Sequence, residues 1–360
     1  MYLINYAGSG GSEKYVQTLA QNLIKCGGTP FLCYNKSGGL VDIMKTMGII
    51  CFKLEMAHPF DIKAAIYLAK LCKKYNIQVV HTQFARENYI AILAKIMHSK
   101  ASVVYTSHIN IKNNIIWKFT NYFFTKQNSA IIAVCNSVRN LAIQNNYPSN
   151  KITVIYNGVE VIHKNNEIIK SLLKESDFTF VTLARLSEEK GLFFLLESVK
   201  ILVNNNESIK FCLKIAGDGH LKHNIQQYIS DNCLHNYVKL LGHVSNTKDL
   251  LSTSHVYINS SYSEALSFGI LEAMSYGLPI IVTNVGGNVD IIKNSNNGFL
   301  VSFGDAVNMS SAMLSIINYY NNPYSNMYNT YSNNSKIAIH NVFNINNVIE
   351  KTFNIYKSTN

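Results

Sequence analysis

Cysteine pairs with the spacing of metal or redox sites are missing from this sequence. None of the seven cysteines stands in a CxxC arrangement, their number is odd, and they are scattered along the chain, at Cys26, Cys33, Cys51, Cys72, Cys135, Cys212 and Cys233. Disulfide frameworks need paired cysteines, and structural zinc sites use closely spaced ones. We therefore expect neither, and interpret the cysteines as reduced packing residues.

Long apolar runs are missing as well. No stretch approaches the roughly 18 uninterrupted apolar residues that a membrane-spanning helix needs. Residues 1–11 are too short and too rich in glycine for a signal peptide, so we predict a cytoplasmic protein. Apolar residues make up 48% of the 360 positions and are spread over the whole chain, which is enough for two domains with a core each.

Complete phosphate-binding motifs are also absent. The chain has no Walker lysine motif, and the GxGxxG fingerprint fails because Glu13 stands where its last glycine should be. Gly8, Gly10 and Gly11 nevertheless follow the first apolar segment, and a helical pattern with Ser12 as its expected N-cap comes next. Glycines before a helix let the backbone approach a phosphate, so this segment gives weak support for phosphate binding.

Acidic residues are scarce in the first half of the chain. Residues 1–160 contain 17 Lys and Arg against 6 Asp and Glu, whereas residues 161–360 contain 15 of each, so the first half carries the entire net charge of +11. An exposed basic half attracts polyanions or an anionic membrane surface. The alternative is ordinary solubility charge.

Apolar segments of strand length alternate with amphipathic helical segments along the whole chain. This alternation predicts parallel sheets built from βαβ units, and hence an α/β fold with two doubly wound, Rossmann-like domains that face each other across a cleft. Strands are expected at residues 2–7, 29–34, 48–54, 77–82, 102–107 and 130–135, and again at 178–184, 210–217, 237–242, 255–260, 279–284 and 298–302.

The alternation breaks around residues 147–177, and we place the domain boundary there, near Gly158. The predicted domains are residues 1–158 and 159–340. Residues 341–360 include a further amphipathic helix, which we expect to pack back on the first domain.

Two carboxylates stand at a predicted strand-to-helix loop. A short helix is expected after the strand at 255–260. Glu264 precedes this helix, and Glu272 lies on it. The same eight-residue separation occurs in Glu167/Glu175 and Glu189/Glu197, so spacing alone cannot choose among the pairs. Ligands of open α/β sheets bind at strand-to-helix loops, and this context favours the Glu264 pair.

Basic side chains follow two other predicted strands. Arg185 and Lys190 come after the strand at 178–184, near the start of a helix, where two cations are tolerable if an anion lies between them. Alternatively, Lys190 pairs with Glu188 or Glu189. His108 follows the strand at 102–107; an isolated histidine is more often a packing or capping residue than a functional one.

Together these motifs resemble the retaining glycosyltransferases of family 4, which have the GT-B type of fold. The resemblance covers essentially the whole chain: GGSE at 10–13, His108, NGVE at 157–160, ARLSEEKG at 184–191, IAGDG at 215–219, LLGHV at 240–244 and EALSFGILEAMSYGLPIIVTNVGG at 264–287. The last block is highly specific. Ala265 and Ile109 depart from the family, which often has glycine and an acidic residue there, and this leaves the sugar preference open.

The resemblance implies a nucleotide-diphosphate sugar as donor, bound by the second domain. Its diphosphate would be held by Arg185 and Lys190, its ribose by Glu272, and its sugar by Glu264 with the backbone amides around Leu266, Ser267 and Phe268. From the first domain, Gly10 and Gly11 would approach the phosphates and His108 would reach the sugar. Retention would follow from front-face attack through an oxocarbenium-like state, with the donor phosphate accepting the acceptor's proton.

The resemblance also implies the partners. The acceptor would be a glycan or lipid-linked molecule of cell-envelope or exopolysaccharide synthesis, with no nucleic acid involved. Since the chain has no DxD motif and carries Arg185 and Lys190, we expect no metal and no cofactor. The alternatives are a nucleotide-sugar epimerase of the same fold, a phosphorylase, whose pyridoxal phosphate lysine has no signature here, and a non-catalytic sugar-nucleotide-binding partner of another transferase.

One basic and apolar segment suits docking on an anionic leaflet. Lys112 and Lys118 flank Ile115, Ile116 and Trp117, and further lysines stand at Lys70, Lys73 and Lys74. Peripheral membrane association would bring a lipid-linked acceptor to the enzyme. The alternative is that Trp117 and its neighbours are buried core and that the lysines only confer solubility.

Overall fold

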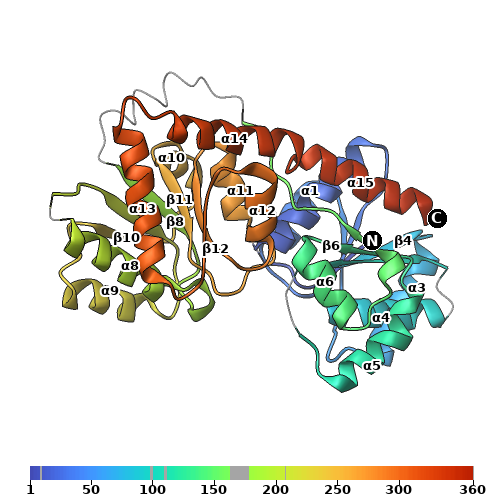
Figure 1. Cartoon of the computed structure of the whole chain (residues 1–360). Helices are drawn as coiled ribbons and strands as arrows, with labels where there is room; N and C mark the ends of the chain where they lie inside the picture. The colour runs from blue at the N-terminus through green and yellow to red at the C-terminus, as the bar shows by residue number, and fades with distance from the viewer. Residues whose placement is uncertain (9, 98–99, 109–111, 163–177, 207, 360) are drawn as a thin grey trace. The chain divides into compact units, whose positions relative to one another are not determined.

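The structure is a computed structural model, which describes the chain except residues 9, 98–99, 109–111, 163–177, 207 and 360 (Figure 1). It divides into two compact units. The N-terminal unit comprises Met1–Asn157 together with Asn346–Asn360, and the C-terminal unit comprises Gly158–Ile345. The sequence placed the corresponding boundaries at residues 158 and 340.

The N-terminal unit is built on a seven-stranded parallel sheet. Its strand order is β3-β2-β1-β4-β5-β6-β7, so the order reverses direction between β1 and β4. The strands are β1 (Tyr2–Tyr6), β2 (Phe31–Lys36), β3 (Ile50–Lys53), β4 (Val79–Thr82), β5 (Ser102–Ser107), β6 (Ala130–Ala133) and β7 (Ile152–Val154).

Helices connect these strands in the order that the alternating pattern predicts. They are α1 (Gly11–Lys25), α2 (Gly39–Thr46), α3 (Ile62–Lys74), α4 (Ala85–Ile96), α5 (Ile115–Phe124) and α6 (Asn136–Gln144). A core cluster formed by the apolar faces of the strands and of α3 and α4 includes Leu3, Cys33, Leu68 and Ile90. Burial of this apolar surface is the main term that holds the unit together.

The last helix, α15 (Ile345–Ser358), belongs to the N-terminal unit although it comes last in the chain. It buries Val348, Thr352 and Phe353, and the Tyr356 hydroxyl lies 2.5 Å from Nδ1 of His81 on β4. The N-terminal unit is therefore assembled from both ends of the sequence.

The C-terminal unit contains a six-stranded parallel sheet of order β10-β9-β8-β11-β12-β13. Here the direction of the order reverses between β8 and β11. The strands are β8 (Thr179–Leu183), β9 (Cys212–Ala216), β10 (Val238–Gly242), β11 (Val256–Asn259), β12 (Ile280–Thr283) and β13 (Gly298–Val301).

The core of the C-terminal unit lies between this sheet and its helices, and it includes Phe180, Leu195, Ile258 and Met313. The helices are α8 (Leu192–Asn205), α9 (Lys222–Asp231), α10 (Thr247–Ser252), α11 (Phe268–Ser275), α12 (Gly287–Ser295), α13 (Ala306–Asn321) and α14 (Met327–Asn341). None of the helices in the described parts of either unit is long and apolar enough to cross a bilayer.

The two Rossmann-like parallel sheets confirm the predicted α/β fold, and all twelve predicted strands are present. The structure also corrects three details. β7 was not predicted, α1 is capped by Gly10 and not by Ser12, and Cys26 and Cys233 are exposed, so they are not packing residues.

Candidate functional site

The strand order points to one edge of the C-terminal sheet as a ligand site. In open α/β sheets, ligands bind beyond the carboxyl ends of the strands at the point where the order reverses. That point lies between β8 and β11. The two loops that leave it are residues 184–191 after β8 and residues 260–267 after β11, and they carry Arg185, Lys190 and Glu264.

Direct contacts join the two loops. Lys190 Nζ lies 2.8 Å from Glu264 Oε2 in a pair whose side chains are only 23% and 14% exposed. The Ser260 hydroxyl donates to the Lys190 carbonyl at 2.8 Å, and the Tyr262 amide donates to the Glu189 carbonyl at 3.0 Å. Lys190 thus pairs with Glu264 across the point where the strand order reverses. The alternative pairing with Glu188 or Glu189 is wrong.

The other charged groups of the loop after β8 have separate partners. Glu188 accepts a hydrogen bond from the His220 ring at 2.9 Å. Glu189 accepts one from the Ser187 hydroxyl at 2.6 Å, which lowers the pKa of this carboxyl, and the charges of Lys190 and Arg185 lower it further. Arg185 itself is exposed. A solvent-accessible cationic group therefore lies on the same loop as Lys190, which pairs with Glu264.

Helix α11 brings the second carboxylate to the same region. Leu266, Ser267 and Phe268 form its N-terminal end, where backbone amides and the positive end of the helix dipole favour an anion or a polar ligand. Glu272 lies one turn along the helix and is half-buried. Burial raises the pKa of Tyr257 on β11, and the charges of Glu264 and Glu272 raise it further, so both carboxylates lie near this phenol.

Tyr257 is a residue that the sequence did not single out. Its hydroxyl donates to the Leu183 carbonyl at 3.3 Å and accepts from the Leu183 amide at 3.4 Å, at the end of β8. A Cβ placed on Gly269 of α11 would lie 2.6 Å from the Tyr257 hydroxyl. This phenol therefore holds the end of β8 and the start of α11 together beneath the candidate site.

The remaining glutamate pairs do not form such a site. Glu197 lies on α8, accepts a hydrogen bond from the Tyr228 hydroxyl and pairs with Lys200 at 3.8 Å, and is thus engaged away from the loop that carries Glu189. The pair Glu167/Glu175 lies outside the described residues.

A buried amide network attaches the loop after β12 to the loop after β11. Asn288 Nδ2 donates to Asn259 Oδ1 and to the Thr283 carbonyl, both at 3.1 Å. The Thr283 hydroxyl donates to the Ser261 carbonyl at 2.5 Å, and the Gly287 amide donates to the Ala265 carbonyl at 2.6 Å. These contacts fix the backbone on both sides of Glu264.

Glycines allow the loops to approach one another this closely. A Cβ on Gly217 would lie 1.8 Å from the Ala184 carbonyl oxygen, one on Gly219 would lie 2.3 Å from the Leu186 oxygen, and one on Gly191 would lie 2.2 Å from the Ser260 oxygen. Real Cβ atoms do not approach backbone so closely. The glycines of the IAGDG and ARLSEEKG motifs are therefore required for packing the loop after β8 against its neighbours.

In the N-terminal unit, His108 lies just beyond the carboxyl end of β5. Its Nε2 is 2.9 Å from Gln83 Oε1, and because that oxygen accepts, Nε2 carries the ring proton. The ring packs edge-on against Tyr15 of α1 at 5.2 Å. Burial lowers the pKa of His108 to about 4, so the imidazole is neutral at pH 7 and can accept a hydrogen bond at Nδ1.

The glycine segment after β1 differs from a plain phosphate loop. Gly10 precedes α1 and Gly11 begins it, so their backbone lies at the positive end of the helix. The Glu13 carboxylate, however, is buried, accepts from the Ser12 hydroxyl at 2.8 Å and lies 2.8 Å from the position of a Cβ on Gly10. A carboxylate thus occupies the space beside Gly10 that a phosphate was expected to approach.

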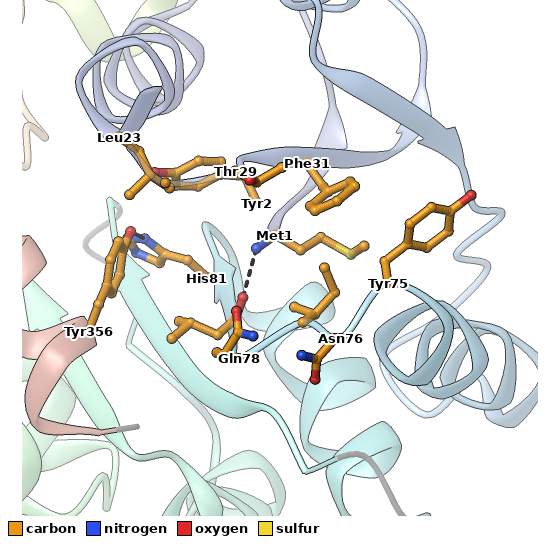
Figure 2. Close-up of a pocket in the computed structure, with 13 residues that line it drawn as sticks. Met1, Tyr2, Leu23, Thr29, Phe31, Tyr75, Asn76, Gln78, His81 and Tyr356 are labelled. Carbon is orange, nitrogen blue, oxygen red and sulfur yellow. Dashed lines mark hydrogen bonds between the residues drawn. The ribbon is translucent and has the colours of Figure 1, made fainter. Parts of the chain in front are cut away.

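A pocket of about 380 Å³ lies at the opposite edge of the same sheet, where β1 and β4 begin. Figure 2 shows His81 and Tyr356 on one side of it and the Met1 amine, which donates to the Val79 carbonyl at 2.7 Å, at its centre. The predicted site residues are not among those that line it. Because ligands of doubly wound sheets bind at the carboxyl ends, we do not assign the pocket to the donor.

Within the described residues, no three His, Cys, Asp or Glu side chains are grouped so that they could hold a metal ion. Arg185 and Lys190 are the cationic side chains that the loop after β8 brings to the candidate site.

Two family models match the chain in succession. Residues 9–162 match the model described as Glycosyltransferase Family 4, and residues 163–337 match the model described as Glycosyl transferases group 1. The division between the two matches falls close to the boundary between the structural units, at residues 157 and 158.

Two relatives with similar sequences are also named as glycosyltransferases. The chain is 29% identical over 314 residues to the UDP-Gal:alpha-D-GlcNAc-diphosphoundecaprenol alpha-1,3-galactosyltransferase of Escherichia coli, which covers 82% of this chain and 79% of the relative. It is also 29% identical over 275 residues to the capsular polysaccharide biosynthesis glycosyltransferase CapH of Staphylococcus aureus, covering 71% of this chain and 72% of that one.

Among solved structures, HepE of Anabaena in complex with UDP superimposes with a TM-score of 0.84 over 99% of both chains, at 16% sequence identity. At this identity the likeness concerns the fold, which is the same across the full length of the chain.

Proposed function

Because the chain belongs to the group 1 glycosyltransferases, which have the GT-B fold, we propose that it is a retaining, metal-independent transferase that moves a sugar from a nucleotide-diphosphate sugar to a lipid-linked or glycan acceptor. The observation that carries the proposal is the Lys190–Glu264 pair, which joins the two loops where the strand order of the C-terminal sheet reverses. The exposed Arg185 lies on the same loop as Lys190. A cation and a carboxylate in contact there suit a ligand with a diphosphate and sugar hydroxyls.

The donor would lie along the carboxyl edge of the C-terminal sheet. Arg185 and Lys190 would bind the diphosphate, whose negative charge grows as the glycosidic bond breaks. Glu272 would accept hydrogen bonds from the ribose. Glu264 would contact sugar hydroxyls, together with the amides at the start of α11. The complex of the fold relative with UDP supports a uridine nucleotide.

The chemistry assigned to this site needs no enzymatic nucleophile. The bond between the anomeric carbon and the donor phosphate breaks, and the acceptor oxygen attacks the same face of an oxocarbenium-like centre. The acceptor's proton passes to the departing phosphate oxygen, so atoms and charge balance. The two side-chain cations would stabilise this transition state more than the ground state, which is the condition for catalysis.

The role of the N-terminal unit is proposed from its own geometry. His108 is neutral at pH 7 and held by Gln83, so it would act as a hydrogen-bonding group toward the donor sugar and not as a cation. Gly10 and Gly11 would approach the phosphates through their backbone, provided that the Glu13 side chain moves aside.

Cell-envelope or polysaccharide synthesis is the proposed setting. The galactosyltransferase relative is named for an acceptor on diphosphoundecaprenol, and CapH is named for capsular polysaccharide biosynthesis. A lipid diphosphate acceptor would place the enzyme on the cytoplasmic face of a membrane.

The function is tested by incubating the purified chain with a panel of UDP- and GDP-sugars and a lipid-diphosphate saccharide acceptor, and by determining the anomeric configuration of the product by NMR. Transfer with retention supports the proposal. Binding of nucleotide sugars without turnover would favour the non-catalytic alternative, and interconversion of the donor sugar would favour the epimerase.

Substitution of Glu272 and substitution of Glu264 should affect different steps of the reaction. Glu272→Ala should weaken the binding of free nucleoside diphosphate roughly 10- to 100-fold, because a hydrogen bond to a charged group contributes about 1.5–3 kcal/mol. Glu264→Ala should leave nucleotide affinity near wild type and lower the rate of transfer. Titration calorimetry with UDP and GDP, together with transfer kinetics, measures both, and equal losses of nucleotide affinity in the two variants would contradict the assignment.

Activity should persist without divalent metal. The diphosphate charge is assigned to Arg185 and Lys190, so transfer in excess EDTA should equal transfer in buffer. The control is an EDTA-treated sample to which Mg²⁺ or Mn²⁺ is restored. Loss of activity on chelation with recovery on restoration would show that a metal carries the role given to the side chains.

A further inference from the structure

Helix α5 exposes an apolar face that the protein's own core does not cover. Ile115, Ile116, Phe119, Tyr122 and Phe123 are between 48% and 82% exposed, although the helix has only ten residues. Positions 115, 119, 122 and 123 repeat at helical spacing and so share one face. The Phe119 and Phe123 rings contact each other edge-on at 4.8 Å. Single exposed apolar residues are ordinary, whereas a contiguous set of this kind marks an interaction surface.

The opposite face of α5 is anchored in the N-terminal unit. Trp117 stacks on Phe60, with ring centroids 6.1 Å apart and planes 8° from parallel, and it lies 5.8 Å from the Tyr89 ring of α4. The buried Asn121 donates to the Asn145 carbonyl at 2.7 Å. Trp117 is therefore an anchor of the helix and not part of its exposed face, which corrects its place in the predicted docking segment.

The charged residues along the sequence on either side of α5 have one sign. The sequence contains no Asp or Glu between Glu87 and Glu160, whereas Lys or Arg occurs in that stretch at Lys95, Lys100, Lys112, Lys118, Lys126, Arg139 and Lys151. Lys112 is exposed just before the helix, and Lys126 just after it lies 3.7 Å from the centroid of the Tyr122 ring. The apolar face is thus flanked by lysines at both ends of α5.

From these observations we propose that α5 is the membrane-docking element of the protein, with an anionic bilayer surface as its partner. A short amphipathic helix whose apolar side chains enter the interface and whose lysines meet anionic headgroups has this combination of features. A second copy of the chain fits less well, because its identical face would bring lysines opposite lysines. Figure 1 shows α5 at the periphery of the N-terminal unit, beside α4.

This inference deepens the proposed function and rests on it only for the lipid-linked acceptor. Docking through α5 would hold the N-terminal unit at the surface in which such an acceptor lies, and so confine the search for acceptor to two dimensions. Binding to vesicles is measurable without turnover, so the two proposals can fail independently.

The test is co-sedimentation of the full chain with vesicles of phosphatidylcholine alone or mixed with phosphatidylglycerol, at low and high salt. We expect binding to the anionic vesicles only, weakened by salt. Phe119→Glu with Phe123→Glu, and separately Lys112→Glu with Lys126→Glu, should each weaken binding on the order of tenfold or more. Matched controls in the C-terminal unit are the exposed Ile337→Glu and Lys239→Glu, which should bind like wild type.

Circular dichroism and thermal unfolding establish that each variant is folded. The membrane assignment is overturned if the wild-type chain does not bind anionic vesicles or binds neutral vesicles equally well. It is also overturned if the α5 variants bind anionic vesicles as well as the wild type does. Sedimentation velocity tests whether the apolar face of α5 instead binds a second copy of the chain. A concentration-dependent dimer that Phe119→Glu abolishes would also overturn the membrane assignment. Vesicle binding that depends on α5 in a chain without transferase activity would instead refute the proposed function and leave the docking surface intact.

Discussion

Replacing either Arg185 or Lys190 by alanine should lower the rate of transfer at saturating donor by about 2–4 kcal/mol of transition-state stabilisation, or roughly 30- to 900-fold. The reason is electrostatic. Cleavage of the donor builds charge on a diphosphate, and the only cations assigned to that charge are these two side chains. The effect should fall on turnover more than on the binding of the donor, because the interaction strengthens as the bond breaks.

The fold should survive both substitutions, since Arg185 is exposed and the Lys190 backbone keeps its bond to Ser260. Lys222→Ala is the matched control, because it removes an exposed lysine whose partner, Asp218, lies in the neighbouring loop after β9. Steady-state kinetics and thermal unfolding are the measurements. Turnover near wild type in both Arg185→Ala and Lys190→Ala would remove the diphosphate assignment.

Gly217→Ala should destabilise the protein by about 3 kcal/mol or more. Gly217 has φ +147°, a conformation that L-residues rarely adopt, and its added Cβ would meet the Ala184 carbonyl oxygen at 1.8 Å. Strain of this kind contributes about 1–3 kcal/mol, and the backbone overlap adds to it. The loop after β8 would have to move, so activity should fall together with stability. Urea unfolding monitored by circular dichroism gives the free energy of unfolding.

Gly242 supplies the control for that experiment. It lies at the end of the adjacent strand β10 with φ +70°, but nothing lies within 4 Å of its would-be Cβ. Gly242→Ala should therefore cost only about 1 kcal/mol, the cost of the backbone conformation alone. If both variants lose the same amount, the close approach between the loops does not matter to stability.

The sheets could be predicted from the sequence because each buried parallel strand is a short apolar run, and such runs are visible without knowledge of their neighbours. β7 escaped this reasoning because it has only three residues and a single buried one, Ile152. Helix α14 is hard to predict from apolar periodicity because it is rich in Asn and Ser, and its buried Ser335 donates to the Leu278 carbonyl at 2.7 Å. A polar side chain that is buried because it hydrogen-bonds to a backbone group far away in the sequence adds nothing to the apolar periodicity from which a helix is predicted.

The sequence singled out both Lys190 and Glu264 as candidate site residues, but it did not predict that they pair with each other. Lys190 and Glu264 are 74 positions apart, and the nearer carboxylates on η3 (Glu188–Lys190) offered an equally plausible local pairing. Tyr257 looks like an ordinary strand residue in the sequence, because its role depends on Leu183 of the neighbouring strand. The position of the buried Glu13 carboxylate beside Gly10 could not be predicted either, because it depends on the geometry of α1.

The position of α15 has a consequence for synthesis on the ribosome. Domains usually fold in the order in which they are made. Here the N-terminal unit receives Val348, Phe353 and Tyr356 only after residues 1–345 have been translated, and by then the whole C-terminal unit has already been synthesised. The first unit to be made is therefore the last to be completed, and until then the surfaces that α15 covers, including the His81 side of β4, stay open to chaperones and proteases.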